Sequence, residues 1–474
     1  MSESQMLKRL GECKWELPLG FKSGMRVPGI VYADESVLEK ALQDKALEQV
    51  ANVATLPGIV KCSLAMPDIH WGYGFPVGGV AAFDLDEGVI CPGGIGYDIN
   101  CGVRLISTPL LAEEVRPRLP VLMDTLFRDI PSGVGSEGFI KLDKVESRSV
   151  LETGARWAIE KGYGFEEDLR RCEEGGCMDG ACADAVSAKA IKRGSQELGT
   201  LGSGNHFLEV SVVEEVLDEE TASAYGIWRG QVTVMVHTGS RGLGHQVCTD
   251  HIEIMVDAIE RYGIFVPDRQ LACVPVDSPE GKDYYAAMAA AANFAWANRQ
   301  VLTHLVRQSL MKVFSNLTYN QLRVIYDIAH NIAKIEEHVL DSKPKKVCVH
   351  RKGATRAFWS GTGVPHPVLV PGDMGRRSWV LKGTQTAMKE SFGSCCHGAG
   401  RTLSRAGARK QVRGEQVKTT LEQMGIEVRS HSLSGLAEEA PQVYKDVDQV
   451  VQICCDAGIC QKVASLRPIG VLKA

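Results

Sequence analysis

The stretch QVTVMVHTGSRGLGH, residues 231–245, decides the fold class of this chain. Val232, Val234 and Val236 alternate with the residues between them, and an alternation with a period of two predicts a β-strand. The strand ends at His237, where glycines begin to recur and permit a tight turn. We therefore expect a sheet that presents polar side chains at the ends of its strands, next to glycine-rich loops.

Strand and helix patterns both occur on either side of this stretch. Dense glycine and proline runs predict loops over 66–79 and 91–104. Farther along the chain, the hydrophobic spacing predicts long helices over 281–314 and 319–340, and it places His330 on the polar face of the second helix.

No internal repeat, low-complexity tract or proline- and serine-rich linker divides the 474 residues. We therefore expect an α+β fold in which 1–474 form one large domain, with a helical subdomain at about 281–340. Because the chain is longer than a single core usually grows, two domains are the alternative.

Composition excludes several classes of protein. The mean hydropathy of −0.07 and the 44% hydrophobic share exclude an integral membrane protein. The first residues contain no apolar stretch long enough for a signal peptide, and the 15 cysteines are an odd number. We therefore expect reduced thiols in a cytoplasmic protein that has no membrane partner.

The charge of the chain is unevenly distributed. Its 53 basic and 58 acidic residues give a formal net charge of −5, which taken alone argues against a nucleic-acid partner. Residues 343–418, however, contain 16 Lys and Arg residues against three acidic ones, a charge of +13, so the remainder carries −18. This segment predicts a polyanion site, and charges scattered over a solvated surface are the alternative.

Five polar residues in or beside the predicted loops and strand ends are of the types that bind metals: Asp98, Cys101, His206, His237 and His330. A carboxylate and a thiol three positions apart in a tight loop can reach the same ion. Each residue taken alone is more often structural. A mixed-ligand metal site follows only if the fold brings the five together.

A second candidate centre is SCCHGAGR, residues 394–401. The glycines leave His397 uncrowded, and the backbone amides together with Arg401 suit phosphate oxygens. An imidazole nitrogen can attack phosphorus and form a phosphoramidate, which carries a nucleotide covalently. The chain has neither a G-x-x-x-x-G-K-[ST] loop nor the K-x-D-G lysine motif of the usual nucleotidyl-transferring ligases, so no motif indicates a lysine nucleophile in place of His397. A structural histidine in a turn is the alternative.

Two groups of cysteines are close together in the sequence. The three within 172–182 are spaced more widely than a C-x2-C zinc pair, and no role is assigned to them. Cys454, Cys455 and Cys460 are interpreted as small core residues of a helix.

Taken together, these motifs resemble the RtcB family of GTP-dependent RNA-splicing ligases over nearly the whole chain. The stretches that carry the resemblance are MPDIHWGYGFPVGG (66–79), GGIGYDINCGVR (93–104), LGTLGSGNHFLEV (198–210), HTGSRGLGH (237–245), YDIAHN (326–331), PGDMG (371–375), CHGAGR (396–401), EAPQVYKDVD (439–448) and RPIGVLK (467–473). So many long motifs in one order are specific to a family.

The resemblance implies a deep central cleft that binds two manganese ions and GTP. It implies that the five residues of the candidate metal site are the ligands, with Cys101 bridging the ions, and that His397 becomes guanylylated. The implied nucleotide contacts come from Asp68, Asn205, Glu209, Pro371, Asp373, Ser378, Ala399, Gly400, Tyr444 and Lys473. The implied RNA phosphate contacts come from Arg193, Arg241, Arg401 and Arg405.

Two positions depart from the common pattern of the family. Asp373 stands where many members have a small hydroxyl residue, so we expect one nucleotide contact to differ from that of the family. Trp71 follows Asp-Ile-His where an amide residue is frequent, which bears on the wall of the cleft.

The implied reaction joins an RNA 2′,3′-cyclic-phosphate or 3′-phosphate end to a 5′-hydroxyl end through a GMP–histidine intermediate, in tRNA splicing, RNA repair or both. An archease-type activator often accompanies the family. Two other classes stay open on the residues alone: a metal-dependent phosphoesterase that processes RNA ends, and a non-catalytic RNA-binding protein. For the ligase, we expect Arg376, Arg377, Arg401 and Arg405 to border the cleft around His397.

Overall fold

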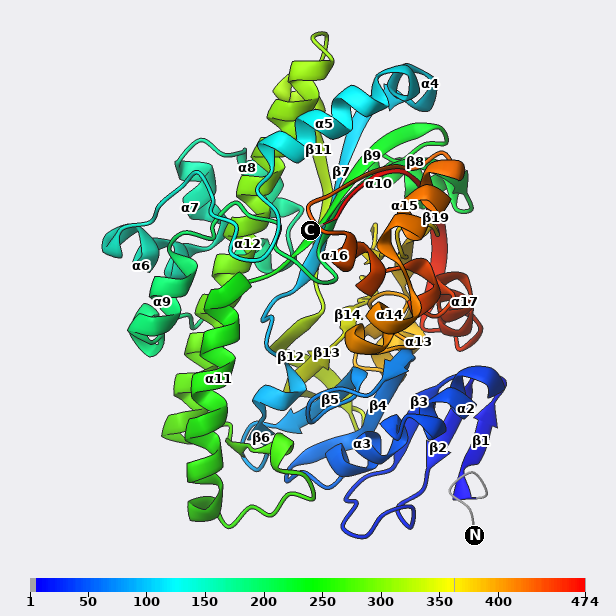
Figure 1. The fold of residues 1–474 in the computed structure, drawn as a ribbon. Coiled ribbons are helices and arrows are strands. Elements are labelled where there is room, and N and C mark those ends of the chain that lie inside the picture. Colours follow the sequence, from blue (N-terminus) through cyan, green and yellow to red (C-terminus); the bar gives the residue numbers. More distant parts are fainter. Residues whose placement is uncertain (1–5, 362, 474) are drawn as a thin grey trace.

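Two large β-sheets with helices packed around them form the body of the protein (Figure 1). The computed structural model describes residues 6–361 and 363–473. The seven-stranded sheet contains, in spatial order, β1 (Lys8–Gly11), β2 (Lys14–Leu17), β3 (Gly29–Tyr32), β4 (Ile59–His70), β5 (Val77–Asp84), β13 (Lys343–Lys352) and β12 (Asn331–Leu340). The eight-stranded sheet contains β11 (Arg323–Ala329), β7 (Gly102–Leu111), β9 (Gln231–Thr238), β8 (Phe207–Val216), β19 (Cys460–Lys473), β16 (Ser378–Gly383) and β15 (Pro367–Val370), with β18 (Glu427–Ser430) beside β19. Two short pairs are β6 (Val89–Ile90) with β10 (Val274–Pro275) and β14 (Ala354–Arg356) with β17 (Ser394–Cys396).

Helices pack around the sheets, so the mixed α+β class is confirmed. They are α2 (Glu35–Gln43), α3 (Ala46–Val53), α4 (Ala112–Val115), α5 (Leu119–Asp129), α6 (Lys144–Thr153), α7 (Ala155–Glu160), α8 (Glu166–Arg170), α9 (Ala188–Gly194), α10 (Glu219–Tyr225), α11 (Arg241–Ala258), α12 (Pro279–Val313), α13 (Gln385–Glu390), α14 (Arg405–Gln411), α15 (Gly414–Gln423), α16 (Leu433–Glu438) and α17 (Val447–Asp456). Among the described residues, no helix combines the length and the apolar character that crossing a membrane requires.

The strand predicted within 231–245 is β9, which lies inside the eight-stranded sheet. It pairs antiparallel with β7 on one side and with β8 on the other, and all of its residues are buried. Val103 of β7 and Phe207 of β8 are the partners of His237. His237 therefore lies beside the first residues of two neighbouring strands.

The helix predicted over 281–314 is confirmed as α12, whereas the helix predicted over 319–340 is wrong, because that segment forms β11 and β12. Its isoleucines are β-branched and suit a strand as well as a helical stripe. Asp327 and Lys334, which the helical pattern placed on a polar face, are buried and paired with buried ions of opposite charge. His330 is the residue between the two strands, so it lies where the chain crosses from one large sheet to the other.

The two predicted glycine-rich loops are partly strand. β4 runs as far as His70 and therefore includes Asp68, and β7 begins at Gly102, directly after Cys101. Asp68 lies where the pairing of β4 with β5 shifts register, between Ala65 and His70, and Cys101 lies one residue before β7, so both are positioned by strands rather than by a long loop.

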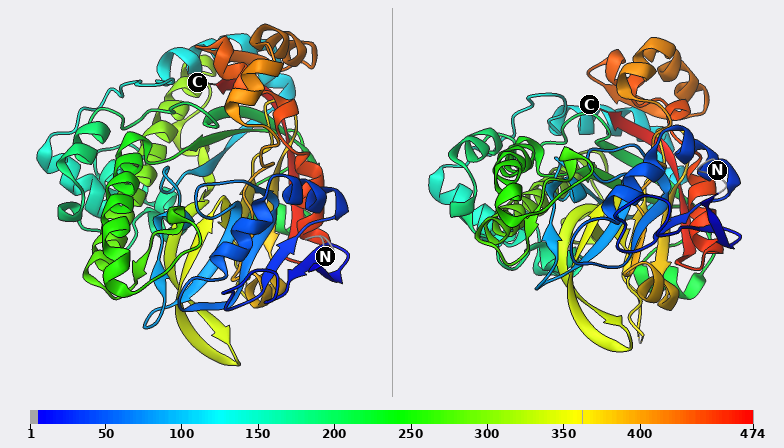
Figure 2. Two further views of the ribbon diagram at one scale, coloured as in Figure 1. Left: turned by 60° about the horizontal axis from the view of Figure 1, so that its bottom comes forward. Right: turned by 90° about the horizontal axis from the view of Figure 1, so that it is seen from below.

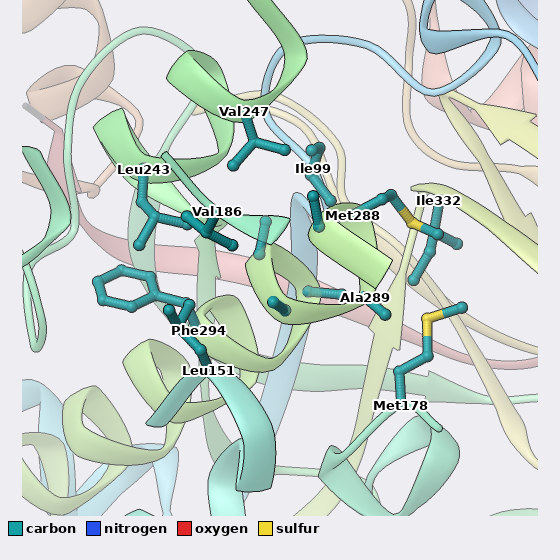
Figure 3. Close-up of a cluster of buried hydrophobic side chains, with 14 of the residues drawn as sticks. Ile99, Leu151, Met178, Val186, Leu243, Val247, Met288, Ala289, Phe294 and Ile332 are labelled. Atoms are coloured by element: carbon teal, nitrogen blue, oxygen red, sulfur yellow. The ribbon is translucent and has the colours of Figure 1, made fainter. Parts of the chain in front are cut away.

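The helix α12 runs through a large buried hydrophobic cluster (Figure 3). Met288, Ala289 and Phe294 of α12 belong to this cluster, together with Leu243 and Val247 of α11. Small alanines along α12 let neighbouring elements approach closely, and the buried polar residues of the same helix bond to the loops around it. The helix therefore acts as a core element that also anchors loops.

The tip of the β12–β13 hairpin and the helices α14–α16 project from opposite ends of the body in both views of Figure 2. The hairpin has exposed lysines at Lys343, Lys345 and Lys346. Part of the +13 charge of 343–418 therefore lies on this hairpin, and another part lies on α14 with its basic last turn. The basic segment is thus divided between distant surfaces.

Candidate functional site

His397 is held by Asp68 at a cleft between the elements just described. Asp68 is fully buried, and its Oδ2 atom accepts hydrogen bonds from His397 Nδ1 at 2.6 Å and from the His397 backbone N–H at 2.9 Å. Because Nδ1–H is donated to the carboxylate, Nε2 is the ring nitrogen with a free lone pair. The His397 side chain is 15% exposed, so this nitrogen is accessible to a substrate.

The turn after His397 requires glycine at position 400. Gly400 has a φ of +73°, and a Cβ atom there would lie 2.3 Å from the backbone carbonyl oxygen of Asp68. Any side chain would force β4 away from the turn. Glycine at this position therefore keeps Asp68 close to His397.

Two groups of metal-binding side chains meet at the sulfur of Cys101. Its Sγ atom lies 3.3 Å from His237 Nε2, which lies 3.2 Å from His330 Nε2. On the other side, Sγ lies 3.5 Å from His206 Nε2, and this nitrogen lies 2.8 Å from Asp98 Oδ2. Within each group the ligand atoms are all within 4.8 Å of one another. The structure thus brings together all five residues that the sequence predicted, with Cys101 common to both groups.

The electrostatics of these groups suit a cation. His206 Nδ1–H donates to the Leu201 carbonyl at 2.9 Å, so a proton or a cation must lie between Nε2 and the Asp98 carboxylate. Burial acts to raise the pKa of Asp98, but the interactions of its carboxylate with His206, Cys101 and Arg241 outweigh burial and lower the pKa to about 2. Burial lowers the pKa values of His237 and His330 well below the ordinary value, so both imidazoles are neutral. A carboxylate, a thiol and neutral imidazoles are a donor set for a divalent first-row metal.

The buried side chain of Arg299, on α12, fixes the two loops that carry these ligands. Its guanidinium donates to the backbone carbonyls of Asn100 and Thr238, each at 2.8 Å. It also donates to both carboxylate oxygens of Asp327. Asn100, which directly precedes the ligand at 101, has a left-handed φ of +52°, so its conformation depends on these contacts.

The cleft beside His397 has a volume of about 610 Å³. His237 and His330 line it, as do Arg401 and Arg405. Eight of the ten predicted nucleotide residues also line it: Asn205, Glu209, Pro371, Asp373, Ala399, Gly400, Tyr444 and Lys473. A cavity of this size and mixed lining is of the kind that binds a small organic ligand.

The buried carboxylate of Glu439 contacts two arginines, a tyrosine and a lysine that form one wall of the cleft. It accepts hydrogen bonds from Arg401 Nη1 at 3.1 Å and from Arg405 Nε at 3.2 Å. The hydroxyl of Tyr444 also donates to it. Lys473 Nζ lies 3.8 Å from the same carboxylate, and burial lowers the pKa of Lys473 to about 8. This wall therefore presents positive charge that is already partly balanced.

A second buried carboxylate of the cleft, Glu209, is easily protonated. Burial raises its pKa to about 7, although the hydroxyls of Ser211 and Ser378 donate hydrogen bonds to it at 2.5 Å and 3.2 Å. Ser378, itself a predicted nucleotide residue, is fully buried and outside the cleft lining. Its contacts with the cleft lining run through Glu209 and through the Gly372 backbone N–H, which donates to the Ser378 hydroxyl at 3.1 Å.

Two of the predicted RNA-binding arginines lie outside the cleft lining. Arg193 donates to the Gln246 side chain at 3.0 Å, and Arg241 donates to the Thr200 hydroxyl at 3.1 Å. Arg241 is nonetheless close enough to Asp98 for its charge to contribute to the low pKa of that carboxyl. The structure thus places Arg241 next to the metal-binding groups rather than in the cleft.

The expectation that Arg376 and Arg377 border the cleft is wrong, since neither lines it. Arg376 pairs with Asp373, which does line the cleft, at 3.2 Å. Arg377 pairs instead with Glu215 of β8 and Asp448 of α17. Acidic residues that are distant in sequence therefore draw Arg377 away, and a local charge count does not reveal them.

Sequence reasoning also missed several residues of the cleft. Phe207, Asn331, Lys352 and Glu439 all line it. Phe207 and Asn331 directly follow predicted metal ligands, and that adjacency is the signal that could have found them. Trp71 lines the cleft as well, which agrees with the expected effect of this unusual residue on the cleft wall.

The cysteines within 172–182 make separate contacts. Arg104 donates to Cys172 Sγ at 3.0 Å, and Cys177 Sγ donates to the Glu152 carbonyl at 3.4 Å. In the part of the chain that the structure describes, Cys172, Cys177 and Cys182 are in none of the groups of converging ligand atoms.

Two groups of possible metal ligands beside a carboxylate-held histidine, at a cleft in a mixed fold, form a site of the kind found in metal-dependent enzymes. A family model described as tRNA-splicing ligase RtcB matches residues 49–474. The chain is 57% identical to the tRNA-splicing ligase RtcB of Thermococcus kodakarensis and 53% identical to that of Archaeoglobus fulgidus, with 100% of each chain covered. It is 53% identical to the RNA-splicing ligase RtcB of Mycobacterium tuberculosis, over 90% of this chain and 100% of that protein. The chain belongs to the RtcB family.

Proposed function

We propose that this protein joins RNA 2′,3′-cyclic-phosphate or 3′-phosphate ends to 5′-hydroxyl ends, with GTP as the donor of GMP. Its membership of the RtcB family makes it an RNA ligase of the tRNA-splicing type. The observation that supports the finer reaction is the His397–Asp68 pair, which leaves Nε2 as an exposed nucleophile. The His397 ring is also only 4.9 Å, between centroids, from the ring of the metal-site residue His330.

In the first step His397 Nε2 attacks the α-phosphorus of GTP. A nitrogen–phosphorus bond forms, and the bond to the leaving pyrophosphate breaks. Asp68 accepts the hydrogen bond from His397 Nδ1, so the proton stays on that nitrogen, and the carboxylate stabilises the positive charge that develops on the ring. Water opens a cyclic phosphate end to a 3′-phosphate and a 2′-hydroxyl, which breaks the bond between phosphorus and O2′. An oxygen of the 3′-phosphate then attacks the phosphorus of the GMP, and the nitrogen–phosphorus bond to His397 breaks. The 5′-hydroxyl of the second RNA end then displaces GMP and seals the strand.

We propose that the two ligand groups hold two Mn²⁺ ions that share the sulfur of Cys101. The converging Nε2 atoms of His237 and His330 fit such an ion, and so does the close pair formed by His206 and Asp98. Imidazole and carboxylate ligands suit manganese, although a thiolate is softer than it usually prefers. When bound, the ions would neutralise negative charge on the phosphate oxygens.

The guanine nucleotide is proposed to occupy the cleft next to His397. Glu209, when ionised, can accept hydrogen bonds from the N–H groups of the base. The turn at Ala399 and Gly400 offers backbone amides, and Lys473 a positive charge. Asn205, Pro371, Asp373, Ser378 and Tyr444 complete the proposed nucleotide residues.

The RNA backbone is proposed to follow the arginines. Arg401 and Arg405 line the cleft, and Arg241 lies near the metal-binding groups, so these three fit a path from the cleft past the metals. Arg193 would contact RNA farther out. We further propose that residues 1–474 act as one domain, in the cytoplasm, on broken tRNA or other cleaved RNA, with an archease-type protein as a possible activator.

The deciding experiment is incubation of the protein with α-labelled GTP and Mn²⁺. We expect an acid-labile labelled adduct on the wild-type protein and none on His397→Ala. His431→Ala, which removes an exposed histidine outside the cleft lining, should label as well as the wild type. Full labelling of His397→Ala would refute the assignment of the nucleophile.

The same experiment separates the two other classes of function. A metal-dependent phosphoesterase would open cyclic phosphate ends without GTP and without an adduct. A non-catalytic RNA-binding protein would form no adduct and would leave the ends unchanged. Cys101→Ala should lose bound manganese and labelling together, and an unchanged manganese content would remove Cys101 from the ligand set.

A further inference from the structure

Three buried cysteines from separate parts of the chain bring their sulfur atoms together outside the cleft. Cys395 is on β17, Cys454 is on α17 and Cys460 is the first residue of β19. Their sulfur atoms lie within 4.8 Å of one another, and no side chain of the three is more than 1% exposed. We call these three residues the cysteine cluster. The interpretation of Cys460 as part of a helix is wrong, because it begins a strand.

Two further thiols are in contact with the cysteine cluster. Cys396 Sγ lies 3.8 Å from Cys395 Sγ, and Cys455 Sγ lies 3.6 Å from Cys460 Sγ. A tetrahedral zinc ion with Zn–S bonds of about 2.3 Å separates its sulfur ligands by about 3.8 Å. A disulfide bond needs about 2.05 Å. The three sulfur atoms of the cysteine cluster, within 4.8 Å of one another, are therefore close enough to converge on one ion, and no pair of thiols with a printed distance is at disulfide-bond length.

We propose that the cysteine cluster binds one zinc ion through the sulfur atoms of Cys395, Cys454 and Cys460. Cys396 and Cys455 are not among the converging sulfur atoms, so the fourth position is left to a water molecule. Each thiol gives its proton to solvent as its sulfur binds, so one S–H bond breaks for each Zn–S bond that forms. The oxidation states of zinc and sulfur do not change, and the step needs no further reactant.

The surroundings of the cysteine cluster contain an unused hydrogen-bond donor. The hydroxyl of Tyr32 is fully buried and has no hydrogen-bond partner among the described residues. Tyr32 belongs to the same buried hydrophobic cluster as Cys395, Cys454 and Cys460.

A zinc ion in this position would tie together elements that lead into the cleft. β17 ends at Cys396, directly before His397, and β19 runs from Cys460 to Lys473. α17 packs on both strands. The ion would therefore restrain the backbone that positions the nucleophile and the backbone that ends at Lys473, at a site separate from the metal-binding groups of Cys101.

The test measures zinc in the full-length chain. All variants carry Cys101→Ser, which removes the thiol of the other metal-binding groups. After exposure to Zn²⁺ alone and removal of free metal, adding Cys454→Ser and Cys460→Ser should lower the zinc content by one ion per chain. Cys273→Ser, which removes a buried free cysteine from a different hydrophobic cluster, should leave it unchanged. Equal zinc contents in all three proteins overturn the proposal.

A second measurement needs no substitution in the cluster and so does not depend on how its variants fold. In the Cys101→Ser protein, Zn²⁺ should protect Cys395, Cys454 and Cys460 from alkylation at least tenfold, as read by mass spectrometry of the modified peptides. Co²⁺ should give the absorption of a tetrahedral thiolate complex. Unprotected thiols in the presence of Zn²⁺, or a Cys455–Cys460 disulfide in the purified protein, overturn the proposal.

Discussion

One oxygen atom of Asp68 holds both the backbone and the ring of His397, at 2.9 Å from the amide nitrogen and 2.6 Å from Nδ1. The double contact fixes the side-chain rotamer and the tautomer at once. We predict that Asp68→Asn lowers the rate of adduct formation with labelled GTP by about 10²-fold. The amide oxygen can still accept both hydrogen bonds, but it no longer offers a charge that stabilises a positive ring.

Two further variants make this prediction specific. Asp68→Ala, which also removes the acceptor, should react more slowly than Asp68→Asn. Asp84→Asn, at a buried carboxylate that instead bonds to Lys345 and to backbone amides, should keep the wild-type rate. Equal rates for wild type and Asp68→Asn would show that the charge of Asp68 is not used.

Arg299 is predicted to control metal binding without touching a metal. Arg299→Lys removes the paired hydrogen bonds that hold the carbonyls of Asn100 and Thr238. We expect manganese affinity to fall by about 10–100-fold, as it does when outer contacts of metal ligands are lost. Titration of the protein with Mn²⁺ measures this change.

Arg307→Lys is the matched control for Arg299→Lys. Arg307 is also a fully buried arginine of α12, and it pairs through two hydrogen bonds with Asp168, away from the metal-binding loops. Both variants should lose stability, because lysine keeps the charge but cannot form the paired hydrogen bonds of a guanidinium with a buried carboxylate. Only the Arg299 variant should lose manganese affinity, and an equal loss in both would reduce the role of Arg299 to general stability.

Glu209 is predicted to make nucleotide binding depend on pH near neutrality. Burial raises its pKa to about 7, and only the ionised form is a pure hydrogen-bond acceptor for guanine N–H groups. Affinity for GDP should therefore rise about tenfold from pH 6 to pH 8. In Glu209→Gln this pH dependence should disappear, and a wild-type affinity that is flat over the same range contradicts the prediction.

The Glu209 carboxyl should also make the free energy of unfolding of the nucleotide-free protein depend on pH. Its folded-state pKa of about 7 lies above the ordinary value of 4.5, so the folded state favours the protonated form. This contribution, about 3 kcal/mol, is fully present below pH 4.5 and is lost as the pH rises through 7. Denaturation of the wild type and of Glu209→Gln at several pH values should show a difference that changes in this direction.

Arg405 is predicted to contact RNA phosphate, whereas Arg377 is not. Arg405 lines the cleft and is half exposed, and Arg377 is engaged by acidic residues away from the cleft lining. Arg405→Ala should weaken RNA binding and reduce the slope of log affinity against log salt by about 1. Arg377→Ala should leave that slope unchanged. Indistinguishable slopes for the two variants would remove Arg405 from the RNA path.

The positions of four of the five proposed metal ligands could be anticipated because each of the four accompanies a local pattern. Strand alternation ends at His237, a glycine turn precedes His206, and a tight loop contains Asp98 and Cys101. These signals depend on a few neighbouring residues. The sequence therefore predicted the members of the site, although only the fold shows that they meet.

Secondary structure and ion pairs that depend on residues far away in the sequence could not be predicted from local patterns. The segment around His330 has isoleucines that fit a helix, and the pairing of β11 with β7 and of β12 with β13 decides for strands. Lys334 has a charged side chain typical of a surface, but a buried Glu173 neutralises it. The charge count placed Arg377 at the cleft, whereas Glu215 and other acids hold it elsewhere.

His330 is the residue between β11 and β12, and these strands belong to different sheets. A metal ligand at such a crossing would connect the two sheets as well as donate to the metal. A cation bound there would stabilise the relative orientation of the two large sheets. Loss of the cation would therefore lower both the stability of the fold and the activity. The cooperativity of unfolding of His330 variants should therefore be measured with and without metal. A fall in activity alone does not distinguish the loss of a metal ligand from a weaker connection between the two sheets.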